Sequence, residues 1–365
     1  ILGGGHSLEL YRRFYYLTYL SGANFLLQEL AMLWFFDRDR DGKYELSPLG
    51  EVAQEFFHFV KAHPDIGEPY VPVAILLDAD SGWVCPQGVT RRPGRPEWHQ
   101  PWFPGPALGR AWAKFPHGKA DYMTDWLLDF LFPEYWRCNL PPEEQDGKTR
   151  ARGKELARLF REGKVDKHVH DRGSLVNSRY GDIFDIILDN ASEETLRRYK
   201  LLLASGPMDI GPALRAKLRR FVQEGGILLL NVKQVGKEDE DFLGVALTDE
   251  EGMSDASSRR IRVGKVEIVE RKDYAYKVVR PKGAVPLAVA EDSEGREIVL
   301  LTRRRIGRGE VYLLAQNYML DIEGKGLTEL GKHIVSELVR RFVLAESEGG
   351  AVELVTNLRG RDVVL

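Results

Sequence analysis

The chain has 365 residues, of which 43% are hydrophobic and 29% are charged. This is an ordinary globular composition, and the length allows two or more domains. The 52 basic and 55 acidic residues give a formal net charge of −3, so the charge balance gives no reason to expect a nucleic acid or an anionic membrane as a partner.

The first 65 residues predict two helices around one short strand. Helical spacing of apolar residues indicates a helix over Leu8–Leu20, which Ser21-Gly22 ends. The segment Ala23–Glu29 is typical of a short buried strand. Ser47 and Pro48 then begin a second helix, as its N-cap and its first residue.

Two polar residues, Gln28 and Glu29, end the predicted strand Ala23–Glu29. In a (β/α)₈ barrel, functional side chains sit at this carboxyl end of a strand. The simpler interpretation is that the two residues start a solvated loop. Both interpretations stay open at this point.

An acidic segment follows that strand. Asp37, Asp39 and Asp41 alternate with arginines and precede Gly42, as in the first half of a calcium-binding loop. The twelfth position of such a loop is Pro48 in place of the bidentate glutamate. The segment is therefore either a calcium site of a different geometry or a solvated acidic turn.

A continuous apolar run, Val73–Leu77, is closed by Asp78 and predicts a strand buried on both faces of a parallel sheet. Residues 84–120 form an irregular insertion rich in Trp, Pro and Gly, and helical spacing returns at Asp121–Leu131. Strands are then predicted over Asp182–Leu188, Lys200–Ala204 and Ile227–Asn231, with helices over Glu193–Tyr199 and Pro212–Glu224 between them. This β–α–β–α–β order indicates a parallel sheet with right-handed crossovers.

The period of the apolar residues changes to two over residues 260–301, which predicts antiparallel strands added to the sheet domain. A further strand is predicted over Gly309–Ala315 and a final helix over Gly326–Val343. Residues Ala351–Thr356 begin a last β segment.

Several kinds of site are not supported by the sequence. No glycine-rich phosphate loop lies between a strand and a helix, and neither Cys85 nor Cys138 lies in a nucleophile elbow. The two cysteines form no C-x-x-C motif, which leaves at most one disulfide between them. His168 and His170 could supply the first two ligands of a metal site. The sequence suggests no third ligand, so two exposed histidines are the simpler interpretation.

No apolar run approaches the roughly 20 residues of a membrane-spanning helix. The chain begins at Ile1 without a methionine and ends at Leu365 within a β-like segment. We therefore expect a fragment of a longer protein, and any signal peptide would lie outside this sequence.

The order of these segments resembles one family. Residues 21–29 (SGANFLLQE), a helix and residues 73–83 (VAILLDADSGW) are similar to the junction between the last barrel strand and the next domain in glycoside hydrolase family 42 β-galactosidases. Residues 199–207 (YKLLLASGP) and 218–230 look like the second domain of that family. This domain has the class I glutamine amidotransferase fold without its catalytic residues, and serves in subunit packing.

The resemblance implies three parts. Residues 1–65 would be the end of a (β/α)₈ barrel. Residues 66–346 would be a flavodoxin-like, class I glutamine amidotransferase-like α/β domain, including the insertion at 84–120 and the antiparallel segment at 260–301. Residues 347–365 would start a truncated C-terminal β domain.

The resemblance also implies a function, the retaining hydrolysis of β-linked sugars by two glutamates about 5–5.5 Å apart. Both glutamates would lie upstream of Ile1, so the chain itself would contain no catalytic residue and need no cofactor beyond the calcium considered above. It would give one wall of the active site and a non-catalytic, homo-oligomeric domain, with Gln28 and Glu29 binding sugar hydroxyls and Trp34 as a stacking wall. The family pattern on that strand is not Gln-Glu. The alternative is a non-catalytic carbohydrate-binding or assembly protein of the same architecture.

Overall fold

The computed structural model describes residues 8–23, 35–38, 42–79, 122–132, 178–324, 326–347 and 354–364. The chain divides into two compact units. Unit 1 comprises Ile1–Tyr70, Leu131–Ile183 and Leu344–Leu365, and unit 2 comprises Val71–Phe130 and Phe184–Val343. Within the described ranges, no helix is both long and apolar enough to cross a membrane.

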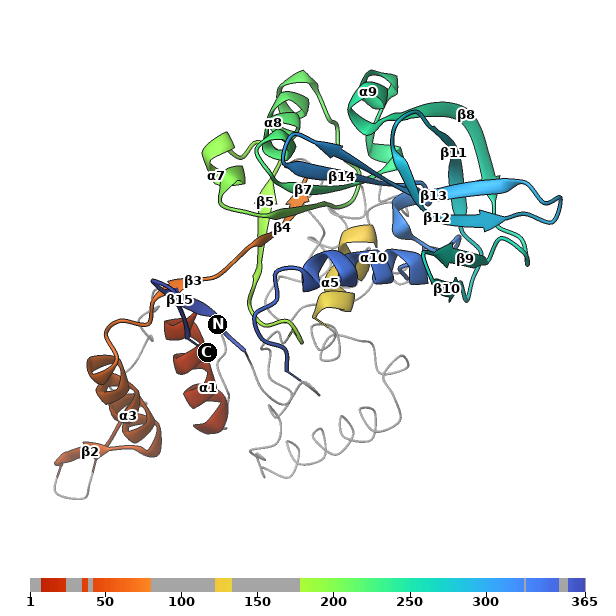
Figure 1. Cartoon of the computed structure of the whole chain (residues 1–365). Coiled ribbons are helices and arrows are strands. Elements are labelled where there is room, and N and C mark those ends of the chain that lie inside the picture. The colour runs from red at the N-terminus through yellow and green to blue at the C-terminus, as the bar shows by residue number, and fades with distance from the viewer. Residues whose placement is uncertain are drawn as a thin grey trace, which may run out of the picture. The chain divides into compact units, whose positions relative to one another are not determined.

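Two helices, α1 (Leu8–Leu20) and α3 (Pro48–Ala62), form the core of unit 1 (Figure 1). Both predicted helices are confirmed. The Ser47 hydroxyl accepts the backbone N–H of Gly50 at 3.0 Å, which is the N-cap that the sequence predicts.

Aromatic rings fill the contact between α1 and α3. Phe56 is almost fully buried, and its ring stacks on that of Tyr15 with centroids 5.3 Å apart. The rings of Tyr16 and Tyr19 meet Phe56 edge-on at 5.5 and 6.0 Å. Aromatic pairs at such distances contribute about 0.5–1.5 kcal/mol each beyond their buried area.

Short strands complete the described part of unit 1. The strands β1 (Phe36–Arg38) and β2 (Tyr44–Leu46) pair antiparallel. The strands β3 (Glu68–Pro69), β15 (Asn357–Arg359) and β16 (Asp362–Val364) form a small sheet in the order β16-β15-β3. A β segment was expected to begin within residues 351–356; residues 354–356 are irregular, and β15 begins directly after them at Asn357. The expected domain boundaries stay predictions.

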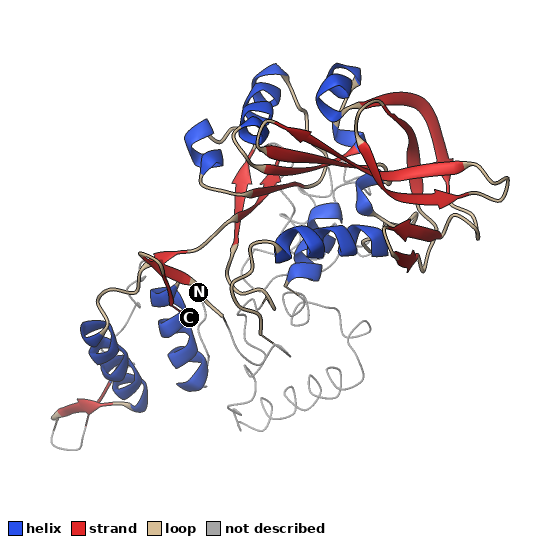
Figure 2. Ribbon diagram, in the orientation of Figure 1, coloured by secondary structure: helices blue, strands red, loops and turns tan. Residues whose placement is uncertain are grey.

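Unit 2 is built on a nine-stranded mixed sheet, seen in Figure 2, whose order is β10-β9-β12-β13-β14-β7-β6-β4-β5. Its parallel strands are β4 (Val73–Leu77), β5 (Phe184–Leu188), β6 (Leu201–Ala204), β7 (Ile227–Asn231) and β14 (Gly309–Leu314). Numbered along the chain, these strands lie in the order 2-1-3-4-5, which is the order of flavodoxin-like sheets. The predicted mixed α/β domain with a parallel sheet is confirmed.

Helices cover both faces of this sheet (Figure 1). The helices α7 (Glu193–Arg197) and α8 (Pro212–Gln223) lie on one face, and α5 (Tyr122–Leu131) and α10 (Glu329–Arg340) lie on the other. The steps β5 to β6 and β6 to β7 move in the same direction across the sheet, so right-handed crossovers place α7 and α8 together.

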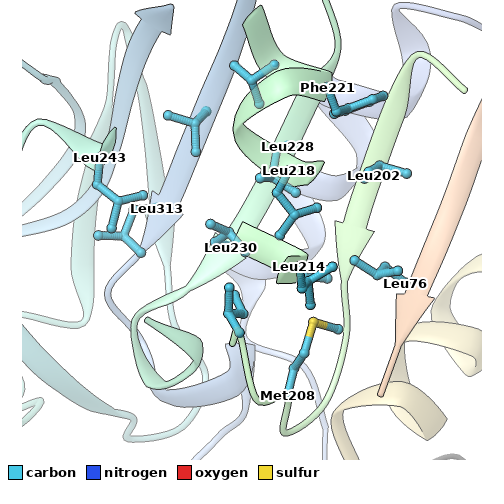
Figure 3. Packing of buried hydrophobic residues seen from close by; sticks show 14 of the residues in the cluster. Leu76, Leu202, Met208, Leu214, Leu218, Phe221, Leu228, Leu230, Leu243 and Leu313 are labelled. Carbon is cyan, nitrogen blue, oxygen red and sulfur yellow. The ribbon is translucent and has the colours of Figure 1, made fainter. Parts of the chain in front are cut away.

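The main core lies between the sheet and α8, as Figure 3 shows. Leu76, Leu202 and Leu230 point from three adjacent strands toward this helix, which contributes Leu218 and Phe221. Alternate residues of the same strands are buried on the opposite face. Burial on both faces explains why these strands are continuous apolar runs.

Antiparallel strands extend the sheet beyond β14. They are β9 (Arg260–Val263), β10 (Val266–Val269), β12 (Val285–Glu291) and β13 (Glu297–Ile306). The prediction of antiparallel strands in residues 260–301 is confirmed for these strands. It is also confirmed for β11 (Ala275–Pro281), which pairs antiparallel with β8 (Val245–Met253) in a separate two-stranded sheet. The segment between β7 and β8 holds α9 (Glu240–Leu243) and two 3₁₀ turns, η3 (Val232–Gln234) and η4 (Lys237–Asp239).

Candidate functional site

The residues that the sequence predicts as ligands fall mainly outside the described ranges. Gln28, Glu29, Trp34, Asp39 and Asp41 all lie there. Their roles stay predictions.

The backbone of the remaining candidate, Asp37, is placed in β1, opposite Glu45 of β2. Among the residues that the structure describes, no group of three or more His, Cys, Asp or Glu side chains could hold a metal ion. Asp39 and Asp41 lie outside the described residues, so this finding does not test the calcium prediction.

Within the described residues, the candidate ligand site is the carboxyl edge of the parallel sheet in unit 2. Open α/β sheets bind ligands outside the carboxyl ends of their strands, where the strand order reverses. In this sheet the reversal lies between β4 and β6. Asp78 follows β4, and Ser205 follows β6.

Ser205 is 1% exposed and lies in a tight turn before Gly206, whose φ is +72°. Its Oγ atom is 2.9 Å from Oγ1 of Thr124 on α5. The backbone N–H of Gly206 contacts the Met123 sulfur at 3.2 Å. Nucleophilic serine chemistry requires an adjacent base, whereas the Ser205 hydroxyl meets the neutral hydroxyl of Thr124. These contacts anchor α5 to the sheet.

Two carboxylates at this edge hold neighbouring loops. The Asp78 carboxylate accepts the backbone N–H of Asp209 at 3.2 Å. The Asp189 carboxylate, at the end of β5, accepts the backbone N–H of Ala79 at 3.1 Å. Each bond links the ends of two adjacent strands.

Amide side chains link the next strands in the same way. Gln234 donates through Nε2 to the carbonyl of Gly206 at 2.7 Å, which joins η3 to the turn after β6. Asn231, at the end of β7, donates through Nδ2 to the carbonyl of Gln316 at 2.5 Å. Each of these buried hydrogen bonds joins the ends of two adjacent strands and so fixes the position of one strand relative to the other.

A third group of bonds connects the end of β14 to the start of α10. The buried Gln316 side chain donates to Glu270 at 3.1 Å and accepts the hydroxyl hydrogen of Thr328 at 2.6 Å. Thr328 is the N-cap of α10, and its Oγ1 accepts the backbone N–H of Gly331 at 3.1 Å. The final helix therefore begins at Glu329, and the predicted start at Gly326 is corrected by this cap.

Strained backbone lies between Gln316 and this cap. Tyr318 and Met319, in the 3₁₀ turn η5 (Asn317–Met319), have φ values of 53° and 55°. Consecutive left-handed residues other than glycine are costly and persist only where the surroundings enforce them. Thr328 donates its backbone N–H to the Met319 carbonyl at 2.8 Å. A side chain at Gly331 would lie 3.0 Å from the Met319 side chain, so that glycine permits the close approach.

One polar atom at this turn lacks a hydrogen-bond partner among the described residues. It is the buried Oδ1 of Asn317. The other polar side chains at this edge form hydrogen bonds that hold strands and loops together. The carboxyl edge, as described, organises the domain and does not bring a nucleophile to a base.

Sequence reasoning missed the residues that organise this edge. Gln316 could have been found, because a polar residue directly follows the predicted strand Gly309–Ala315. Glu270 had no comparable signal, because it lies 46 residues before its partner Gln316. Only the folded chain brings the two together.

Comparison with known proteins gives a likeness of fold. No family model and no curated protein matches the sequence. A catalytic mutant of Gan42B, a GH42 β-galactosidase from G. stearothermophilus, matches with 15% identity and a TM-score of 0.44, over 88% of this chain and 38% of that one. A polyextremophilic β-galactosidase from the Antarctic haloarchaeon Halorubrum lacusprofundi matches with 16% identity and a TM-score of 0.44, over the same shares.

An exo-β-1,4-mannosidase from an Opitutaceae bacterium, strain TAV5, matches with 11% identity and a TM-score of 0.37, over 85% of this chain and 42% of that one. The chain thus spans well under half of the length of each of these three structures.

Proposed function

We propose that the chain is part of a retaining glycoside hydrolase that acts on β-linked sugars. It contributes one wall of the active site and a non-catalytic, oligomer-forming α/β domain. The observation that carries the proposal is the relative direction of α1 and α3 in unit 1.

The two helices run parallel to each other. Arg12 forms an ion pair with Glu55 at 2.9 Å, near the start of the contact. One turn later Tyr16 meets Phe59, with ring centroids 4.7 Å apart. At the ends of the helices the Tyr19 hydroxyl donates to the carbonyl of His63 at 2.5 Å. Residue numbers rise together along both helices, whereas in a helical hairpin they would rise in opposite directions.

Parallel neighbours that follow each other in the chain need a return path. The 15 residues of α3 span about 22 Å at 1.5 Å per residue. A strand over the predicted residues Ala23–Glu29 would span about 23 Å at 3.3 Å per residue. A single strand of that length would return the chain from the end of α1 to the level at which α3 begins. The helix–strand–helix unit of a (β/α)₈ barrel has this construction, with neighbouring helices parallel.

In that arrangement Gln28 and Glu29 would lie at the carboxyl end of the predicted strand, at the end where α3 begins. Barrel enzymes place substrate contacts on this rim. A carboxylate and an amide offer the acceptors and donors that sugar hydroxyls need. Trp34, a few residues further, provides an aromatic face for stacking.

Unit 2 supports the non-catalytic part of the proposal. The carboxyl edge of its sheet is used for contacts between strands, loops and helices, from Asp78 to Gln316. We assign this domain to contacts between subunits.

The test uses the longer protein obtained by extending the reading frame upstream. We expect glutamates at the ends of its fourth and seventh barrel strands and hydrolysis of an aryl β-galactoside. Glu29→Ala should raise KM by about tenfold or more through the loss of a charge-assisted hydrogen bond, with an unchanged urea midpoint. Glu51→Ala, in the exposed first turn of α3, is the matched control and should leave KM unchanged.

Three outcomes would contradict the proposal. Absence of a glutamate at both strand ends would favour the non-catalytic carbohydrate-binding or assembly protein. Turnover by the 365-residue chain alone would show that the strand assignment is wrong. Unchanged kinetics in Glu29→Ala would remove Glu29 from the site.

A further inference from the structure

Three arginines surround one glutamate on the antiparallel side of the sheet in unit 2. Glu310 lies on β14, with Arg305 directly opposite on β13 and Arg303 opposite Tyr312 two residues along. The Glu310 carboxylate is 3.3 Å from Arg305 Nε and 3.7 Å from Arg303 Nη1. Arg341, which follows α10, reaches the same carboxylate at 2.7 Å. These ion pairs join three positive charges to a single negative one.

The cluster is held in place before any ligand arrives. The Tyr312 hydroxyl donates to Glu310 at 2.8 Å and accepts from Arg341 Nη2 at 2.7 Å. Burial alone would raise the pKa of Glu310, but the hydrogen bonds from Arg341 and Tyr312 outweigh it and hold that pKa below its ordinary value. The glutamate side chain is only 14% exposed, so its negative charge is paired mainly with the arginines and little with water.

Two of the arginines keep unused donors. Among the described residues no hydrogen bond involves the guanidinium of Arg303, although its side chain is only 29% exposed. Arg305 uses Nε for Glu310 and leaves its four terminal N–H groups to solvent, at 75% exposure. The two side chains lie two residues apart on one strand and therefore share a face of the sheet. Their donors form a fork for one more anion.

We propose that Arg303 and Arg305, supported by Arg341, form a binding site for a phosphate group. Two positive charges stay unbalanced after Glu310 is counted, and a phosphate dianion would neutralise both. Guanidinium groups bind phosphate oxygens through paired N–H donors. The single carboxylate of Glu310 cannot accept hydrogen bonds from all the N–H donors of the three arginines. The site lies in unit 2 and is independent of the proposed glycosidase activity.

The test is a titration of the 365-residue chain with inorganic phosphate, followed by phosphorus NMR, with potassium chloride keeping the ionic strength constant. We expect saturable binding. Arg303→Gln should weaken it by about tenfold or more through the loss of charge-assisted hydrogen bonds. Arg305→Gln, at a more exposed position, should weaken it in the same direction without affecting folding. Arg304→Gln, on the opposite face of β13, is the matched control and should change the affinity by less than about twofold.

A second titration with a hexose monophosphate separates two sources of the group. Tighter binding of the hexose monophosphate by about tenfold indicates a phosphorylated sugar, and equal binding indicates free phosphate. The proposal is overturned if phosphate does not bind, or if Arg304→Gln weakens binding as much as Arg303→Gln. It is also overturned if Arg303→Gln changes only the oligomeric state, since the cluster would then contact another subunit.

Discussion

The Oε1 atom of Glu270 accepts a hydrogen bond from the backbone N–H of Leu330 at 3.0 Å, at the start of α10. The other carboxylate oxygen accepts the N–H of Glu329 at 2.7 Å. A helix leaves four backbone donors unpaired at its N-terminus and carries a partial positive charge there. The carboxylate satisfies two of these donors from a distant segment of the chain.

Glu270→Ala should therefore lower the free energy of unfolding by about 3 kcal/mol, because two backbone N–H groups lose a charged acceptor in a site where Glu270 is 4% exposed. Urea denaturation followed by circular dichroism measures this change. Glu267→Ala is the control, since Glu267 on β10 is exposed and pairs with Arg260 at the surface. It should cost less than about 1 kcal/mol. Equal losses in both variants would contradict the capping role.

Gly307, in the turn between β13 and β14, permits a close approach to α8. Its φ is +57°, and a side chain there would lie 2.5 Å from the Gln223 carbonyl oxygen. Gly307→Ala should destabilise unit 2 by more than the roughly 1–2 kcal/mol that a left-handed alanine costs by itself. Gly295 has a φ of +77° and nothing within 4 Å of the added carbon, so Gly295→Ala isolates the conformational cost. If the thermal midpoints of the two variants are the same, the turn does not need this contact.

The aromatic core of unit 1 offers a matched pair of neighbouring phenylalanines. Phe56 is 3% exposed and contacts three tyrosines, whereas Phe57 is 60% exposed. Phe56→Ala should cost about 3–5 kcal/mol in the unfolding of unit 1. Phe57→Ala should cost less than about 1 kcal/mol. Urea denaturation followed by circular dichroism compares the two variants with the unsubstituted chain, and similar losses in both would show that α1 and α3 do not pack as described.

Local signals predicted much of the fold. Ser47 and Pro48 mark the start of α3, and the apolar run Val73–Leu77 coincides with β4. The end of α8 was also predicted, because Gly225-Gly226 stops the helix before β7. Each of these features depends on residues within a few positions of each other, where capping and burial act directly.

Features that depend on long-range pairing were not predicted. The sequence of β11 alternates like that of its neighbours, but β11 leaves the main sheet to pair with β8, and alternation does not name a partner. The start of α10 depends on Glu270, which lies about 60 residues earlier. The arginines around Glu310 were also missed, because a run of arginines in a sequence does not show which of them share a face with a carboxylate.

Tyr15 gives unit 1 a characteristic pH dependence. Burial, with a smaller contribution from Tyr11, raises the pKa of Tyr15 to about 12, whereas an exposed tyrosine titrates near pH 10. Below pH 10 the phenol is neutral in both states, and its full contribution to stability is present. Between pH 10 and 12 the unfolded chain ionises first, so the free energy of unfolding falls as the pH rises.

The slope is at most about 1.4 kcal/mol per pH unit for this group, and solvent near the helix surface reduces it. Tyr15→Phe keeps the ring against Phe56 and removes the ionising hydroxyl, so its stability should fall less steeply over that window. Tyr44→Phe, at an exposed position on β2, should retain the original slope. Urea denaturation at pH 9, 10, 11 and 12, values set about the ordinary tyrosine pKa, measures the three slopes. If the slope of Tyr15→Phe equals that of the unsubstituted chain, burial of the Tyr15 phenol does not contribute to the pH dependence.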